Sequence, residues 1–139
     1  MKLFEFEAKS ILREYGLAVP QGTVAKSPAE AAAIAFEIGK PVVLKAQVLV
    51  SGRGRAGGIL VADNADEALD AARRLFGTTI KGSRFESILI EERLDIVQEL
   101  YASVAIDAQE QSYVILASTV GGMDVESVAS NHSGSMVRR

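Results

Sequence analysis

The chain has 139 residues, of which 48% are hydrophobic and 24% are charged, and it carries a formal net charge of −3 and no cysteine. This composition excludes a disordered chain, disulfide bonds and cysteine chemistry, and it does not favour general nucleic-acid binding. The sequence contains neither an apolar signal-peptide run nor the roughly 18 apolar residues of a membrane helix, so we expect a cytoplasmic protein without membrane contact.

Three helices are predicted from apolar spacing and from the residues at their ends: 4–15, 28–38 and 65–76. Ser27 precedes the second helix, with Pro28 at its first position and Glu30 three residues after the serine, which indicates a capping box. Asn64 and Glu67 repeat this arrangement at the third helix. Glycines follow all three helices as stop signals: Gly16, Gly39 and Gly77.

Six short segments rich in β-branched or aromatic residues are predicted to be strands: 23–25, 41–48, 58–61, 86–91, 99–107 and 113–118. Gly121 and Gly122 interrupt this pattern, a short helix is predicted at 124–129, and the remaining tail is polar and unpatterned. The mixture indicates an α/β or α+β fold of two lobes, with a hinge near residues 82–92.

The segment 51–58 (SGRGRAGG) holds four glycines and two arginines, six residues after Lys45. Glycines allow successive backbone amides to point at an anion, and the basic side chains add positive charge, so a phosphate is the natural ligand. From this loop alone, a flexible hairpin with solvated arginines is an equally good interpretation.

The same loop satisfies G-x-G-x-x-G, which by itself is weak support for a dinucleotide-binding domain. That fold requires a helix directly after the loop, whereas residues 58–61 are predicted to be a strand. A P-loop is excluded because no Gly-Lys-Ser/Thr follows, and the kinase motifs are absent. A strand–loop–strand flap over nucleotide phosphates fits better.

A second group of charged residues lies in residues 91–101 (EERLDIVQELY). Acidic residues at a strand end can accept hydrogen bonds from ribose hydroxyls. From spacing alone, however, we favour the interpretation that they are exposed charges at a strand edge, which hinder aggregation.

Four segments, in order and at similar spacing, resemble the β subunits of succinyl-CoA synthetase (succinate–CoA ligase, ADP-forming): 1–22, 41–59, 88–107 and 117–122. The resemblance implies an α+β ATP-grasp fold with an amino-terminal lobe and an incomplete second lobe. Residues 20–92 would form the nucleotide-binding lobe, and residues 1–19 and 93–139 would belong to the second lobe. We expect a fragment that is inactive alone and self-associates through uncovered apolar surface.

The resemblance also implies the roles of individual residues. ATP or ADP would contact seven positions: Lys45, Gly52, Arg53, Gly54, Glu91, Leu94 and Glu99. Leu94 would act through its backbone, Glu91 and Leu94 would lie at the hinge, and the chain itself would supply no catalytic residue. Mg²⁺ would be bound by residues of the family that lie beyond this segment.

In the family, phosphoryl transfer proceeds through a phosphohistidine on an α subunit, with which the β subunit forms a heterodimer or heterotetramer, and yields an acyl-CoA. Arg55, Ser51 and Val120 stand where the family usually has lysine, glycine and glutamate. The acid, whether succinate or malate, and the choice between ATP and GTP stay open. The alternative is a truncated, non-catalytic ATP-grasp module with an assembly or regulatory role.

Overall fold

The computed structural model describes residues 2–122 and 136–138, and the chain divides into two compact units, Met1–Leu94 and Asp95–Arg139. The division falls just beyond the segment 82–92, in which we placed a hinge. Residues 1–19, which we assigned to the second lobe, group here with the first unit, and their helix forms ion pairs with two strands of that unit. Their place in a complete two-lobed domain stays a prediction.

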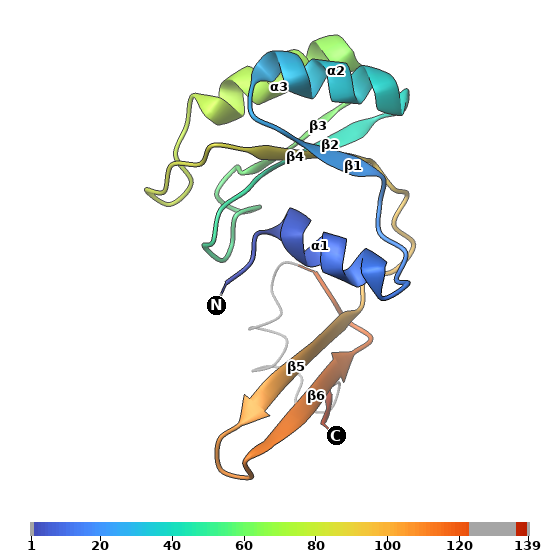
Figure 1. Cartoon of the computed structure of the whole chain (residues 1–139), viewed down its shortest axis with the longest axis vertical. Coiled ribbons are helices and arrows are strands. Elements are labelled where there is room, and N and C mark those ends of the chain that lie inside the picture. Colours follow the sequence, from blue (N-terminus) through green and yellow to red (C-terminus); the bar gives the residue numbers. More distant parts are fainter. Residues whose placement is uncertain (1, 123–135, 139) are drawn as a thin grey trace. The chain divides into compact units, whose positions relative to one another are not determined.

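The first unit is an antiparallel sheet covered by helices on both faces. Its elements are α1 (Glu5–Glu14), β1 (Gly22–Ala25), α2 (Pro28–Ile38), β2 (Val42–Ala46), β3 (Ile59–Ala62), α3 (Ala65–Phe76) and β4 (Ile88–Glu92). The strand order is β1-β4-β2-β3, and every neighbouring pair is antiparallel. Helices α2 and α3 lie on one face of the sheet, and α1 lies on the other (Figure 1).

The core lies between the sheet and the pair α2–α3. Alternation along β2 buries Val42 and Leu44 against these helices, whereas Lys45 points to the face that carries α1. Both helices present alanines to the sheet, and these small side chains let helix and sheet pack closely: Ala31, Ala35, Ala68, Ala71 and Ala72. The apolar side of the sheet therefore stabilises the fold, and its opposite side is left for polar side chains.

The predicted helix caps are confirmed, with one difference in geometry. Ser27 Oγ accepts a hydrogen bond from the backbone N–H of Glu30 at 3.2 Å, and Asn64 Oδ1 accepts one from the N–H of Glu67 at 2.9 Å. The return bond reaches one residue further than in a standard capping box, because the Glu30 carboxylate accepts the N–H of Lys26 at 2.8 Å. Both helices thus start where the sequence predicts.

The second unit contains β5 (Tyr101–Asp107), β6 (Ser112–Ser118) and β7 (Met136–Arg138) in the antiparallel order β5-β6-β7. The first two strands agree with their predictions to within two residues. The third was missed, since it lies in the tail that we interpreted as unpatterned. The helix predicted at 124–129 lies outside the described residues. Among the described residues, no helix is long and apolar enough to cross a membrane.

Candidate nucleotide-binding site

Five charged side chains meet on the face of the sheet that carries α1, and we call them the ion-pair cluster: Glu5, Lys9, Lys45, Arg53 and Glu91. They come from α1, from β2, from β4 and from the glycine loop between β2 and β3. The cluster holds three basic and two acidic groups, so its formal charge has an excess of one positive unit. An anion is therefore attracted to this face.

Lys45 and Glu91 form the inner part of the ion-pair cluster. They lie on the neighbouring strands β2 and β4, where Lys45 pairs with Leu89 and Glu91 pairs with Val43, so both side chains point to the same face. Lys45 Nζ lies 2.6 Å from Glu91 Oε2. Burial alone would lower the pKa of Lys45, but the hydrogen bond from its ammonium to Glu91 and the charge of Glu5 raise it, so Lys45 stays charged.

Glu5 connects the basic groups of the ion-pair cluster. Its Oε1 lies 3.1 Å from Lys45 Nζ and 2.9 Å from Lys9 Nζ, and its Oε2 accepts a hydrogen bond from Arg53 Nη2. Burial alone would raise the pKa of Glu5, but the hydrogen bonds from Lys9 and Arg53 and the charge of Lys45 lower it to about 2. Glu5 is therefore ionised throughout the range in which proteins are normally studied.

The glycine loop at 51–58 is folded by its own turns. Ala56, Gly57 and Gly58 donate backbone hydrogen bonds to the carbonyls of Gly52, Gly54 and Arg53 at 3.2, 3.1 and 3.0 Å. Arg53 also donates from Nη1 to the carbonyl of Ala46 at 2.9 Å, which fixes its guanidinium beside the end of β2.

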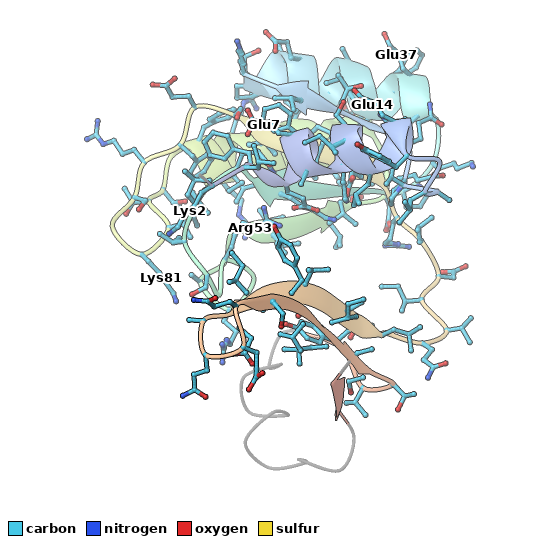
Figure 2. The ribbon with its side chains drawn as sticks, turned by 60° about the horizontal axis from the view of Figure 1, so that its bottom comes forward. Lys2, Glu7, Glu14, Glu37, Arg53 and Lys81 are labelled. Carbon is cyan, nitrogen blue, oxygen red and sulfur yellow. The ribbon has the colours of Figure 1, made fainter. Side chains whose placement is uncertain are left out.

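Gly52 has φ +69°, a conformation that side chains rarely adopt, so glycine is required at this position. A second loop brings the basic residue Lys81 close to the glycine loop. A Cβ built at Gly52 would lie 2.9 Å from the Nζ of Lys81, which belongs to the turn between α3 and β4. Figure 2 labels Arg53 and Lys81 in these two loops. The positive charge near the loop therefore extends beyond the ion-pair cluster.

The structure brings together most, but not all, of the predicted site residues. Lys45, Arg53 and Glu91 meet in the ion-pair cluster, and Gly52 and Gly54 flank Arg53 in the loop. Leu94 is the last residue of the first unit, and it is 52% exposed. Its contact with the nucleotide through the backbone stays a prediction.

Glu99 lies in the second unit, before β5. The backbone N–H of Gly121 donates to the carbonyl of Glu99 at 3.0 Å, and a Cβ built at Gly122 would lie 2.8 Å from the Oε2 of Glu99. The predicted break at Gly121–Gly122 is thus where the chain returns close to this carboxylate. A side chain at Gly122 would therefore require the Glu99 carboxylate to shift.

Our interpretation of the 91–101 acidic residues as exposed strand-edge charges is wrong for Glu91. β4 is an interior strand, between β1 and β2, and Glu91 is only 2% exposed. A buried carboxylate is costly unless it is paired, and here Lys9 and Lys45 both pair with it. Burial of a charged residue away from the apolar core indicates a site rather than a solvated edge.

Glu5, Lys9 and Lys81 were missed as members of the charged surface. Glu5 and Lys9 stand four residues apart, so they share one face of α1 and form an ion pair there at 2.9 Å. This spacing is visible in the sequence. Nothing in the sequence, however, indicates that this helix face lies over β2 and β4.

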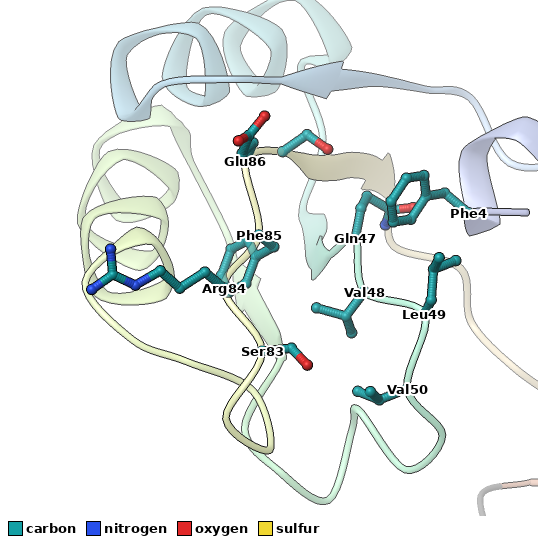
Figure 3. Close-up of a pocket in the computed structure, with 10 residues that line it drawn as sticks. Phe4, Gln47, Val48, Leu49, Val50, Ser83, Arg84, Phe85 and Glu86 are labelled. Carbon is teal, nitrogen blue, oxygen red and sulfur yellow. The ribbon is translucent and has the colours of Figure 1, made fainter.

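Two pockets lie near the cluster in the first unit. A pocket of about 210 Å³ between α1, β1 and β4 is lined in part by Lys9, Gly22 and Glu91. A larger one of about 420 Å³ has aromatic and aliphatic walls that include Phe4, Val48 and Phe85 (Figure 3). No residue of the predicted nucleotide site lines the larger pocket.

The dinucleotide-binding alternative is excluded by the element after the glycine loop. Residues Ile59–Ala62 form β3, which pairs antiparallel with β2, and no helix starts at the loop. A dinucleotide-binding loop runs directly from a strand into a helix. The loop is instead the connection of a β-hairpin, as a phosphate flap requires.

An antiparallel sheet with a glycine-rich hairpin loop, a lysine on the adjoining strand and a buried glutamate on the next one defines an α+β nucleotide-grasping domain. A family model described as an ATP-grasp domain matches residues 2–139. The chain belongs to the ATP-grasp family, which confirms the predicted fold class.

Curated relatives carry the resemblance further. The chain is 48% identical over 129 residues to the succinate–CoA ligase [ADP-forming] subunit beta of Pyrobaculum aerophilum, covering 93% of this chain and 34% of the relative. It is 46% identical to the corresponding subunit of Staphylothermus marinus over 99% of this chain and 36% of the relative. A GDP-forming subunit beta of Thermus thermophilus is 46% identical over 93% of this chain and 34% of the relative. The chain thus spans about a third of their length.

Solved structures of an acetyl-coenzyme A synthetase are also similar to this chain. An acetyl-coenzyme A synthetase of Ca. Korarchaeum cryptofilum, solved with coenzyme A and Ca-AMPCP, has a TM-score of 0.82 at 28% identity, covering 99% of this chain and 59% of that one. The same enzyme solved with a phosphorylated phosphohistidine segment has a TM-score of 0.74 at 28% identity, over 99% of this chain and 58% of that one. The predicted resemblance to CoA-ligase β subunits is confirmed.

Proposed function

We propose that this chain is the nucleotide-binding part of an acid–CoA ligase β subunit, which couples ATP or ADP phosphoryl transfer to acyl-CoA formation. The observation that carries the proposal is the convergence of Lys45 and Arg53 beside a preformed glycine loop, on the sheet face that carries α1 and lies opposite α2 and α3. Basic side chains and a glycine-rich hairpin together supply what phosphate binding requires.

The roles of the residues follow from their chemistry. Lys45 and Arg53 would bind phosphate oxygens, and the backbone of Gly52 and Gly54 would let the loop approach them closely. Glu91 would hold Lys45 in place and present a carboxylate to the nucleotide. Leu94, through its backbone, and Glu99 are proposed as further nucleotide contacts.

The proposed site residues fit a nucleotide, but by themselves they do not fit Mg²⁺. Among residues 2–122 and 136–138, no group of three or more histidine, cysteine, aspartate or glutamate residues is placed to hold a metal ion. Mg²⁺ prefers oxygen ligands, mostly carboxylates and substrate phosphates. We therefore propose that Mg²⁺ would come with the nucleotide and take its protein ligands from outside the described residues, and we derive no step through it.

The relatives suggest the complete reaction. The γ-phosphoryl group of ATP would pass to a histidine of an α subunit and then to a carboxylic acid, as an acyl phosphate. That transfer would restore the histidine, and the thiol of CoA would then displace phosphate from the acyl phosphate to give the acyl-CoA. Succinate is the proposed acid, because the curated relatives are succinate–CoA ligases. The cytoplasm stays the proposed compartment.

Calorimetric titration of the chain with ATP and ADP tests the proposal. We expect saturable binding that is weakened at least about tenfold, or about 1.4 kcal/mol, by Lys45→Gln. Lys40→Gln is the matched control. Lys40 is exposed, and its ion pair with Glu92, at 3.5 Å, lies at the surface and should contribute little. Binding that is absent from the wild type, or that Lys45→Gln leaves unchanged, would refute the proposal.

A further inference from the structure

The basic groups proposed to bind phosphate already hold an anion, the carboxylate of Glu5. One oxygen lies 3.1 Å from Lys45 Nζ, and the other accepts a hydrogen bond from Arg53. Guanidinium and ammonium groups bind carboxylate and phosphate oxygens through the same donors. A nucleotide phosphate that approaches these two side chains therefore meets a position that Glu5 occupies.

We propose that Glu5 is an internal counter-anion of the nucleotide site, which phosphate groups displace from Arg53 and Lys45 when they bind. Glu5 then determines how strongly the site distinguishes ligands by their phosphate charge. This inference rests on the proposed function, and it adds a residue of α1 to a site otherwise built from the sheet and its loops.

The exposure of the two carboxylates separates their roles. The Glu91 side chain is 3% exposed and sits between Lys9 and Lys45, so it is fixed in the structure. The Glu5 side chain is 23% exposed, and so it lies open to solvent at one edge. Arg53 is comparably open, at 18%. A phosphate can therefore reach the cations, and the Glu5 carboxylate can turn away into water, without opening the core.

Helix α1 need not leave the sheet for this exchange. The backbone N–H of Phe6 donates to Gln47 Oε1 at 3.3 Å, and Lys9 remains paired with Glu91. These contacts hold the helix while the Glu5 side chain rotates. A change of rotamer is fast and small compared with a helix movement.

The charge balance gives the direction of the effect. Glu5→Gln leaves an amide oxygen that can still accept a hydrogen bond from Arg53, but it removes one negative charge within 3.1 Å of Lys45 Nζ. The local excess of positive charge then rises, so anionic ligands bind more tightly in proportion to their charge. Adenosine carries no phosphate, so its affinity should not change.

The test compares ligands rather than a single affinity. Adenosine, ADP, ATP and inorganic tripolyphosphate are titrated into the wild type and the Glu5→Gln variant at low salt. We expect ATP and tripolyphosphate to bind about tenfold more tightly to the variant, ADP to gain less, and adenosine to be unaffected. Glu14→Gln is the control, because Glu14 is exposed on the same helix.

Each other outcome overturns the inference. Unchanged or weaker ATP binding would show that Glu5 does not compete, and an equal gain for adenosine would show an effect on structure alone. If Glu5→Gln does not fold, Glu5→Asp, whose carboxylate is withdrawn by one methylene, must show the same preference for ATP over adenosine. A wild type that binds no nucleotide refutes the proposed function, whereas tripolyphosphate binding by the variants still decides the role of Glu5.

Discussion

The perturbed carboxylate of Glu5 predicts how the stability of the first unit depends on pH. Its pKa falls from an ordinary 4.5 to about 2 in the folded protein. A group with a lowered folded pKa stabilises the fold above its unfolded pKa, and this stabilisation is lost as the pH falls toward the folded pKa. The contribution should therefore be complete above about pH 4.5 and should disappear between about pH 4.5 and pH 2.

The magnitude follows from the same shift. At about 1.36 kcal/mol per pKa unit, a lowering from 4.5 to about 2 corresponds to about 3.4 kcal/mol. The Glu5 side chain is 23% exposed, so solvent screening reduces this figure, and we expect about 2–3 kcal/mol. Glu5→Gln should lower the free energy of unfolding by this amount at pH 7.

The assay is urea unfolding of the wild type and Glu5→Gln at several pH values from 7 down to 3. The difference between the two proteins should be largest at pH 7 and should narrow steadily below about pH 4.5. Glu14→Gln, on the same helix but exposed, should unfold like the wild type at every pH. Equal stability of the wild type and Glu5→Gln at pH 7, or a difference that does not narrow in acid, would show that the charge of Glu5 does not stabilise the fold.

Substitutions at three further positions of the first unit are tested by urea unfolding. Gly22→Ala should lose about 1–3 kcal/mol, because its Cβ would lie 2.5 Å from the carbonyl oxygen of Ile90; a fully stable variant would contradict this close approach. Asn64→Ala should lose about 1 kcal/mol of stability through the lost helix cap, and an equal loss in Asn64→Asp, which keeps the cap, would contradict this cause. Glu91→Gln should lose about 2–3 kcal/mol because two lysines lose their charged partner, and a neutral effect would argue against the buried pairing.

The sequence predicted the elements of the first unit well, because their signals are local. Ser27 and Asn64 mark helix starts through hydrogen bonds to residues three positions away, and these bonds form as predicted. The segments rich in β-branched residues form strands, as their local composition predicts. The short strand β7 was missed because its pairing with β6 is non-local and its own three residues carry no pattern.

The site was predicted only in part, because its geometry depends on distant segments. Lys45 and Arg53 stood out through the glycine loop and through the family resemblance. Glu5 also belongs to the site, although it lies 48 residues before its partner Arg53 in the sequence. The burial of Glu91 also depends on strand order, which places β4 between β1 and β2. Neither relation can be derived from spacing along the chain.

Hydrogen exchange of the backbone amides with and without ADP tests the proposed nucleotide site most directly. If the glycine loop and the adjoining end of β2 bind the phosphates, ADP should slow exchange in residues 45–58 and leave α2 (Pro28–Ile38), on the opposite face of the sheet, unchanged. Protection that appears elsewhere in the first unit while residues 45–58 exchange as in the free protein would contradict the proposed nucleotide site.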